Sequence, residues 1–279
     1  MLYATITVCL LFYFTCCVQK HEGATDLNNH YTILVNISRL AKENPDSAIL
    51  CFHQLVKVDK QEKLSDSTLS QLYFHVANAW LFKNKYDSSS WYLNESLRFN
   101  KAGDTVRLKA KVYSRFGLID WYKGNFIESL NWQQKSLVES IKIGDSIDIA
   151  SAYNNIGIVY DRMGAFSKAA EIHLKSLNIR KEIKDTINIP ISYTNLALIN
   201  QQLNQYQVAL ELLIQAKRSL IKNASPFVVA NILTNIGQTY YLLNEYDSAL
   251  YYQNQSLKIR KSIDNKLGVA ACCLLYTSD

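Results

Sequence analysis

A column of polar side chains that recurs every 40 residues is the part of the sequence that could do chemistry. Its members are His75, Arg115, Asn155, Asn195 and Asn235. An asparagine amide offers both a hydrogen-bond donor and an acceptor, which suits the backbone of an extended peptide. The same amides could instead bond to neighbouring parts of the protein and order its fold, and the two roles are compatible. The column therefore predicts a peptide-binding face, a structural ladder, or both.

Residues close to this column extend the candidate site. Lys111 and Arg115 would attract an acidic side chain or a C-terminal carboxylate of a ligand. Trp121 could form an aromatic floor for the ligand, although packing between repeats is the alternative for the tryptophans. The remaining candidates and their neighbours in the pattern are Asn78, Asn154, Gln201 and Gln238, with Ser151, Asp161, Asn231 and Tyr241 beside them.

Motifs for catalysis and for tightly bound cofactors are missing from the sequence. The histidines form no H-E-x-x-H or other close ligand pair, and no C-x-x-C pair exists. The patterns G-x-G-x-x-G, G-x-x-x-x-G-K-[ST] and G-x-S-x-G are also missing. Asp145 and Asp148 lie at an expected helix start, where capping is a simpler role than acid–base work. We therefore expect a protein without enzyme activity, cofactor or metal site.

Composition favours helices throughout the chain. Glycine and proline number only 9 and 3 among 279 residues, whereas a β-rich fold needs both at its many turns. The net charge is +6, and the basic turns Arg180-Lys181 and Arg260-Lys261 have acidic neighbours. We expect these turns to be solvated helix ends rather than a nucleic-acid surface.

The body of the chain is a tandem repeat with a period of 40 residues. An aromatic column contains Tyr86, Phe126, Phe166, Tyr206 and Tyr246, and a column of small residues contains Ala77, Gly117, Gly157, Ala197 and Gly237. Apolar residues at helical spacing predict two amphipathic helices in each unit. Gly164 and its asparagine counterparts should end the first helix with left-handed backbone angles. A fixed period near this length predicts a solenoid.

Six units can be counted, followed by a partial seventh. Their expected ranges are 29–57, 64–102, 104–143, 145–183, 185–223 and 225–263, with the partial unit at 265–271. The next glycine of the small-residue column is due at position 277, which is Thr277. We therefore expect a repeat array over 27–271 that is truncated, with 272–279 as a truncated or non-native tail.

The motif Tyr153-x2-Ile156-Gly157-x2-Tyr160, followed by Ala169 and His173, resembles the tetratricopeptide repeat pattern, and residues 233–249 carry a second copy. The usual period of that family is about 34 residues. The longer period here is similar to the bacterial type found in the N-terminal input regions of signalling regulators. The resemblance implies a right-handed α-solenoid whose first helices line a concave groove for a protein or peptide, with the polar column along that groove.

The N-terminal segment, residues 1–23, differs from the repeats. Residues 1–19 carry no charge and include an apolar run, which predicts a signal peptide, a lipoprotein signal or a membrane anchor. Cys16 and Cys17 are the candidates for lipidation. This segment predicts a cell-envelope location, exported or anchored on the periplasmic side, with the cytoplasm as the alternative.

Two functions follow from the resemblance and this segment together. In the first, the array is the sensory region of a larger signal-transduction regulator whose C-terminal effector is missing from the chain. In the second, the array is a freestanding envelope lipoprotein that assembles other proteins. Both use a protein or peptide ligand in the groove and neither uses a nucleic acid.

Overall fold

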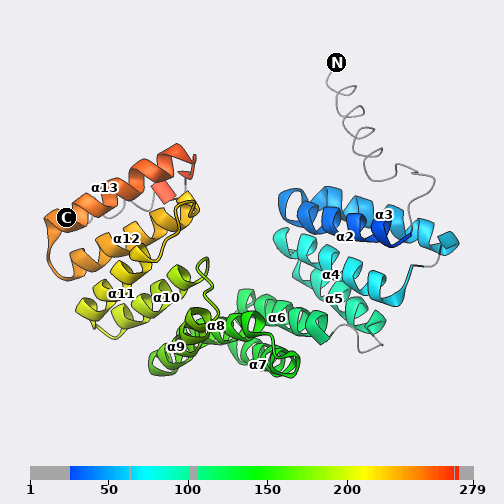
Figure 1. The fold of residues 1–279 in the computed structure, drawn as a ribbon, viewed down its shortest axis with the longest axis horizontal. Coiled ribbons are helices and arrows are strands. Elements are labelled where there is room, and N and C mark those ends of the chain that lie inside the picture. The colour runs from blue at the N-terminus through cyan, green and yellow to red at the C-terminus, as the bar shows by residue number, and fades with distance from the viewer. Residues whose placement is uncertain (1–25, 63, 101–105, 267, 270–279) are drawn as a thin grey trace, which may run out of the picture. The chain divides into compact units, whose positions relative to one another are not determined.

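The computed structural model describes residues 26–62, 64–100, 106–266 and 268–269 (Figure 1). These residues form twelve helices and no strand, so the prediction of an all-α fold is confirmed. The N-terminal segment with Cys16 and Cys17, and the tail 272–279, lie outside the described residues. None of the helices within the described ranges combines the length and the apolar character needed to cross a membrane.

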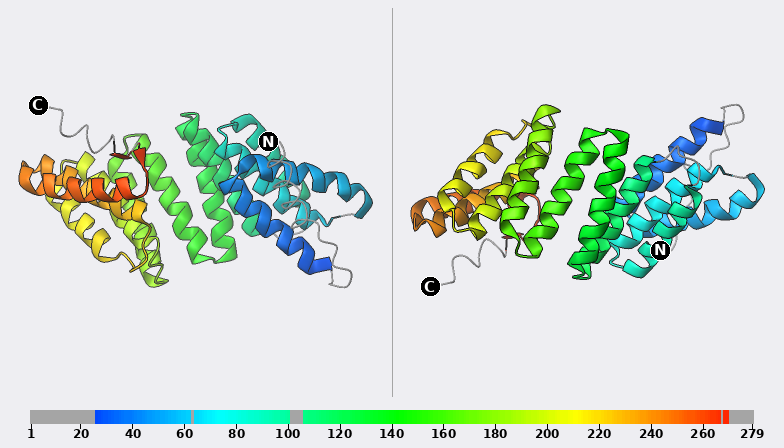
Figure 2. Two further views of the ribbon diagram at one scale, coloured as in Figure 1. Left: turned by 90° about the horizontal axis from the view of Figure 1, so that it is seen from above. Right: turned by 90° about the horizontal axis from the view of Figure 1, so that it is seen from below.

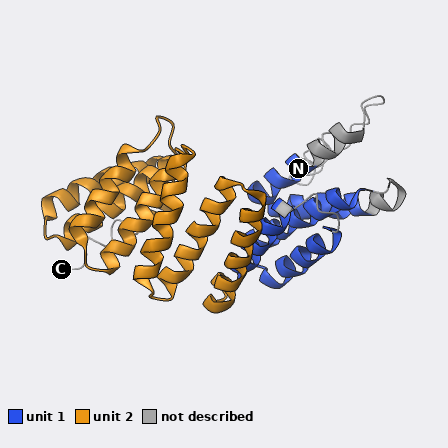
Figure 3. Ribbon diagram, turned by 60° about the horizontal axis from the view of Figure 1, so that its bottom comes forward, with its two compact units in different colours: residues 1–119 blue, residues 120–279 orange. Residues whose placement is uncertain are grey.

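The chain divides into two compact units, residues 1–119 and 120–279 (Figure 3). The described helices of the first unit are α2 (Asp26–Glu43), α3 (Pro45–Glu62), α4 (Asp66–Phe82) and α5 (Tyr86–Phe99). Helix α6 (Val106–Tyr122) begins in the first unit, and its last residues belong to the second. The second unit continues with α7 (Phe126–Ile143), α8 (Ser146–Arg162), α9 (Phe166–Glu182), α10 (Ile189–Gln202), α11 (Tyr206–Arg218), α12 (Pro226–Leu242) and α13 (Tyr246–Ser262).

Successive helices pack on one another within each unit. In the second unit every helix from α7 to α13 contacts the next one along the chain (Figure 2). Helix α10 also contacts α12, and in the first unit α2 contacts α4, so first helices of successive hairpins are neighbours. This is the packing that a tandem array of helix hairpins requires.

The five hairpin turns from α4–α5 to α12–α13 each contain a residue with left-handed backbone angles, as the sequence predicts. Gly164 has φ of 72° and Asn204 has φ of 59°. Tyr206, two residues after the asparagine, donates its hydroxyl to Asn204 Oδ1 at 2.7 Å. Gly164 offers no such acceptor, and the aromatic residue after it is Phe166, which has no hydroxyl. The equivalent turn residues are Asn84, Gly124 and Asn244. The turn residue and its aromatic neighbour therefore vary together.

At two positions of the small-residue column the two helices of a hairpin lie close together. A Cβ added at Gly157 in α8 would stand 2.7 Å from ring atoms of His173 in α9. The same holds for Gly237 in α12, where an added Cβ would lie 2.9 Å from the Gln253 amide of α13. His173 and Gln253, each on the second helix of its hairpin, are buried. Glycine at these two positions therefore leaves space for a large polar group opposite.

A buried serine ties the two helices of a hairpin together, and sequence analysis did not identify it. Ser176 Oγ donates to the carbonyl of Ala150 at 2.7 Å, and Ser256 Oγ to that of Ala230 at 2.8 Å. Ser96 is the equivalent serine of the first unit, bonded to a carbonyl of α4. The signal was present in the sequence, because these serines recur at multiples of the 40-residue period.

Candidate functional site

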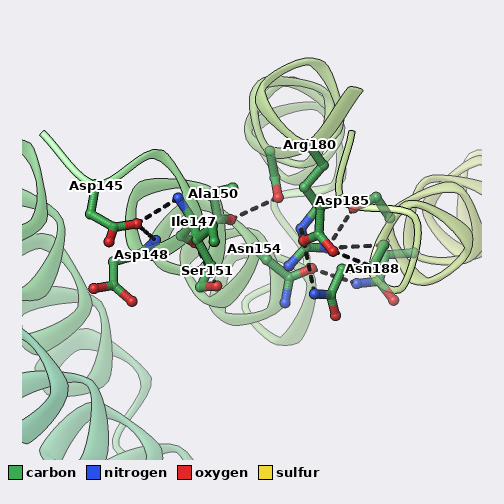
Figure 4. A network of polar contacts seen from close by, with 12 residues as sticks. Asp145, Ile147, Asp148, Ala150, Ser151, Asn154, Arg180, Asp185 and Asn188 are labelled. Atoms are coloured by element: carbon green, nitrogen blue, oxygen red, sulfur yellow. Dashed lines mark hydrogen bonds and ion pairs between the residues drawn. The ribbon is translucent and has the colours of Figure 1, made fainter. Parts of the chain in front are cut away.

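Two of the expected amides lie on α8 and α10, the first helices of two successive hairpins, and bond to each other. Asn195 Nδ2 on α10 donates to Asn154 Oδ1 on α8 at 2.8 Å, and Figure 4 shows Asn154 within this network. Both side chains are half-buried. Within the described chain, Asn195 Oδ1 and Asn154 Nδ2 form no further hydrogen bond. One acceptor and one donor therefore remain on this pair for a ligand.

Other amide side chains of the candidate site also link helices. Asn155 Nδ2 lies 3.4 Å from Gln133 Oε1 of α7. Gln201 is buried and donates its Nε2 to Thr239 Oγ1 of α12 at 2.6 Å. Gln238 is exposed on α12, where Asn235 is half-buried. The structural role is thus present in the ladder, and ligand contact by these residues stays a prediction.

The candidates of the first unit gather on α4 and α6. Arg115 Nε donates to Asn78 Oδ1 at 2.6 Å, and Asn78 Nδ2 donates to the carbonyl of Phe74 at 3.0 Å. Lys111 is exposed, one helical turn before Arg115. Burial, together with the Lys111 charge, lowers the pKa of His75 to about 4, so its imidazole is neutral at physiological pH. The structure therefore brings His75, Asn78, Lys111 and Arg115 together in this unit. Lys111 and Arg115 supply the positive charge of the group.

Trp121 lies at the end of α6, within the second unit. Its ring is half-buried, and the Arg162 guanidinium of α8 lies over it at 5.1 Å from the centroid. The indole Nε1 is buried and has no hydrogen-bond partner among the described residues. The ring thus contacts Arg162 within the second unit, and its use as an aromatic floor for a ligand stays a prediction.

The interpretation of the basic turns as solvated helix ends is wrong for their arginines. Arg180 is only 5% exposed and Arg260 only 6%. Arg180 Nη1 donates to Ser192 Oγ at 2.6 Å and to the Asn188 carbonyl at 3.2 Å, and its Nε lies 4.0 Å from an Asp185 oxygen (Figure 4). Arg260 bonds to polar side chains of α12. An arginine is long enough to reach an adjacent helix, so these residues act between helices and not at a solvated end.

The capping interpretation of Asp145 is confirmed. Its carboxylate accepts hydrogen bonds from the backbone N–H groups of Ile147 and Asp148 at the start of α8, at 2.9 and 3.2 Å (Figure 4). This geometry neutralises the partial positive charge of a helix N-terminus. Across the part of the chain that is described, no group of three or more His, Cys, Asp or Glu side chains is placed to hold a metal ion.

Comparisons with known proteins identify the repeat and place the fold. The family model described as tetratricopeptide repeat matches residues 108–182 and 188–262. No curated protein sequence is significantly similar to the chain.

Solved structures of low sequence identity share the fold. The apo form of RapI is 17% identical over 91% of this chain and 71% of that one, with a TM-score of 0.71. NprR, in complex with its cognate peptide NprX, is 14% identical over 97% of this chain and 78% of that one, with a TM-score of 0.65. A signal-transduction ATPase from Pyrococcus horikoshii with a tetratricopeptide repeat sensor is 19% identical over 91% of this chain and 40% of that one, with a TM-score of 0.72.

Proposed function

We propose that this chain, which belongs to the tetratricopeptide repeat family, is a non-catalytic scaffold that binds an extended peptide or a peptide segment of a protein. The observation that carries the proposal is the Asn154–Asn195 pair, which joins α8 to α10 and keeps one donor and one acceptor unused. An extended peptide backbone presents both an acceptor and a donor at each residue. NprR, which shares the fold, has been solved with its cognate peptide.

The expected binding mode uses the two amides in opposite senses. Asn154 Nδ2 donates to a carbonyl of the ligand backbone, while Asn195 Oδ1 accepts from a backbone N–H. Because the two side chains already fix each other at 2.8 Å, their free groups are held in place before the ligand arrives. Preorganisation of this kind lowers the entropic cost of binding.

The wider role that we propose is the sensory region of a larger signal-transduction regulator. The P. horikoshii protein supports it, because that protein carries a tetratricopeptide repeat sensor and this chain spans 40% of its length. The uncharged N-terminal segment with Cys16 and Cys17 favours the alternative, a freestanding envelope lipoprotein. Recovery of the full reading frame separates these roles. An apolar stretch of about 20 residues and an effector domain after the repeats would support the sensory region, and an end within one or two further repeats would support the freestanding scaffold.

Replacing both amides, Asn154→Ala with Asn195→Ala, should weaken peptide binding about 10-fold, because two hydrogen bonds of roughly 0.5–1.5 kcal/mol each are lost. The probe is the hexapeptide that binds best in a positional-scanning array of end-blocked hexapeptides, labelled with fluorescein. Its Kd is measured by fluorescence anisotropy against the purified chain.

The matched control replaces two exposed asparagines on second helices, Asn131→Ala with Asn178→Ala, and should leave the Kd unchanged. Thermal unfolding is recorded for every variant. Unchanged peptide binding together with a lowered Tm in the Asn154/Asn195 variant would leave these amides only a structural role.

A further inference from the structure

A carboxylate without a counter-ion lies on the same face of α8 as the amide pair. Asp161 follows Asn154 by seven residues, which is two helical turns, and its side chain is half-buried. Within the described residues the Asp161 carboxylate forms neither a hydrogen bond nor an ion pair. Burial raises the pKa of its carboxyl, and the nearby Arg162 charge only partly offsets this effect.

The adjacent cation is engaged elsewhere. The Arg162 guanidinium lies over the Trp121 ring, at 5.1 Å from its centroid, rather than pairing with Asp161. Lys168, which follows on α9, places its ammonium over the Tyr160 ring at 5.8 Å. A partly desolvated carboxylate that lacks a partner is unfavourable. A cation that binds next to Asp161 would therefore stabilise its ionised form.

We propose that Asp161 is a specificity-determining residue that receives a cationic group of the bound peptide. This inference rests on the proposed peptide-binding function and names the ligand chemistry of the same face. The cation is an ammonium or guanidinium of a lysine or arginine side chain, or the free amino terminus of the peptide. All three would form a charge-assisted hydrogen bond with the carboxylate.

Helix geometry sets where this cation lies relative to the backbone contact. Seven residues of α-helix rise by roughly 10 Å, and an extended peptide advances roughly 3.3 Å per residue. A free amino terminus would therefore reach Asp161 when it lies about three residues from the backbone held by Asn154 and Asn195. A lysine or arginine side chain, which supplies part of the distance itself, would serve from a closer position.

The array that tests this inference contains hexapeptide pools with one fixed residue at each position, made both with free and with acetylated amino termini. The signal from bound wild-type chain should be about 10-fold higher for pools with lysine or arginine fixed at one position than for pools with glutamine or methionine fixed there. If the amino terminus is the cation, free-amine pools should exceed acetylated pools instead. Asp161→Asn should abolish either preference and leave the signal of the neutral pools unchanged.

The matched control is Glu171→Gln, which removes an exposed carboxylate of α9 that pairs with Lys175 at 2.7 Å. The Glu171→Gln variant should keep the preference for cationic pools. Peptide binding without a preference for cations, or a preference that survives in Asp161→Asn, would overturn this inference and leave the proposed function intact. Absence of binding to every pool would overturn the proposed function, and this inference with it.

Discussion

Gly157→Ala is expected to lower the free energy of unfolding by about 2 kcal/mol, as overpacking of a close-packed core does. The added methyl carbon would stand 2.7 Å from ring atoms of His173. The ring cannot move aside freely, because His173 is only 2% exposed in the core between α8 and α9. The measurement is urea unfolding followed by far-UV circular dichroism.

The chain provides its own control for this variant. In the α10–α11 hairpin the equivalent positions hold Ala197 and Leu213, which belong to one buried cluster. The double variant Gly157→Ala with His173→Leu copies that pair into the α8–α9 hairpin and should recover most of the lost stability. A neutral effect of the single variant, or a double variant no more stable than the single, would contradict the packing described here.

Acidification is expected to destabilise the chain through His173. Burial, and to a smaller extent the Arg180 charge, lowers the pKa of His173 from 6.5 to about 4. Between these two pKa values the unfolded chain binds the proton more strongly than the folded chain does. The stability that neutral, buried His173 contributes is therefore complete above the unfolded pKa and is lost as the pH falls toward the folded pKa. The free energy of unfolding should therefore drop by roughly 3 kcal/mol between neutral pH and about pH 4.

His173→Gln isolates this contribution from that of His75, whose pKa is also lowered. Glutamine is the residue that packs opposite Gly237 in the α12–α13 hairpin, so it should fit opposite Gly157 with little effect at neutral pH. The difference in urea unfolding between the variant and the wild type is then measured across the acidic range. A difference that does not change with pH would show that His173 titrates normally in the folded chain.

Much of the fold follows from the sequence because the repeat multiplies a weak local signal. One column of the repeat predicts both the turn at Gly164 and the asparagine turn at Asn204, and both residues have left-handed φ angles. The close approach at Gly157 follows from a column of small residues. Each column reports one constraint of helix packing several times, so a single sequence was enough to assign it.

The rest depends on which side chain reaches which helix, and periodicity does not report that. Arg180 and Lys181 are adjacent and equally basic, yet Arg180 is buried against α10 while Lys181 is exposed. The bond between Asn195 and Asn154 joins two positions offset by one residue from the repeat register. No column of identical positions contains that pair, although both residues were candidates individually.

The measurement that tests the central claim most directly is site-specific photocrosslinking of the bound peptide. Leu198 is half-buried on α10, about one turn from Asn195 and on the same face, whereas Val208 is exposed on α11. Each is replaced in turn by p-benzoylphenylalanine, and the fluorescein-labelled hexapeptide is irradiated with either variant. If the ligand lies on the first helices of the second unit, the peptide crosslinks from position 198 and not from position 208. Crosslinking from position 208 alone, or equally from both positions, would contradict this assignment.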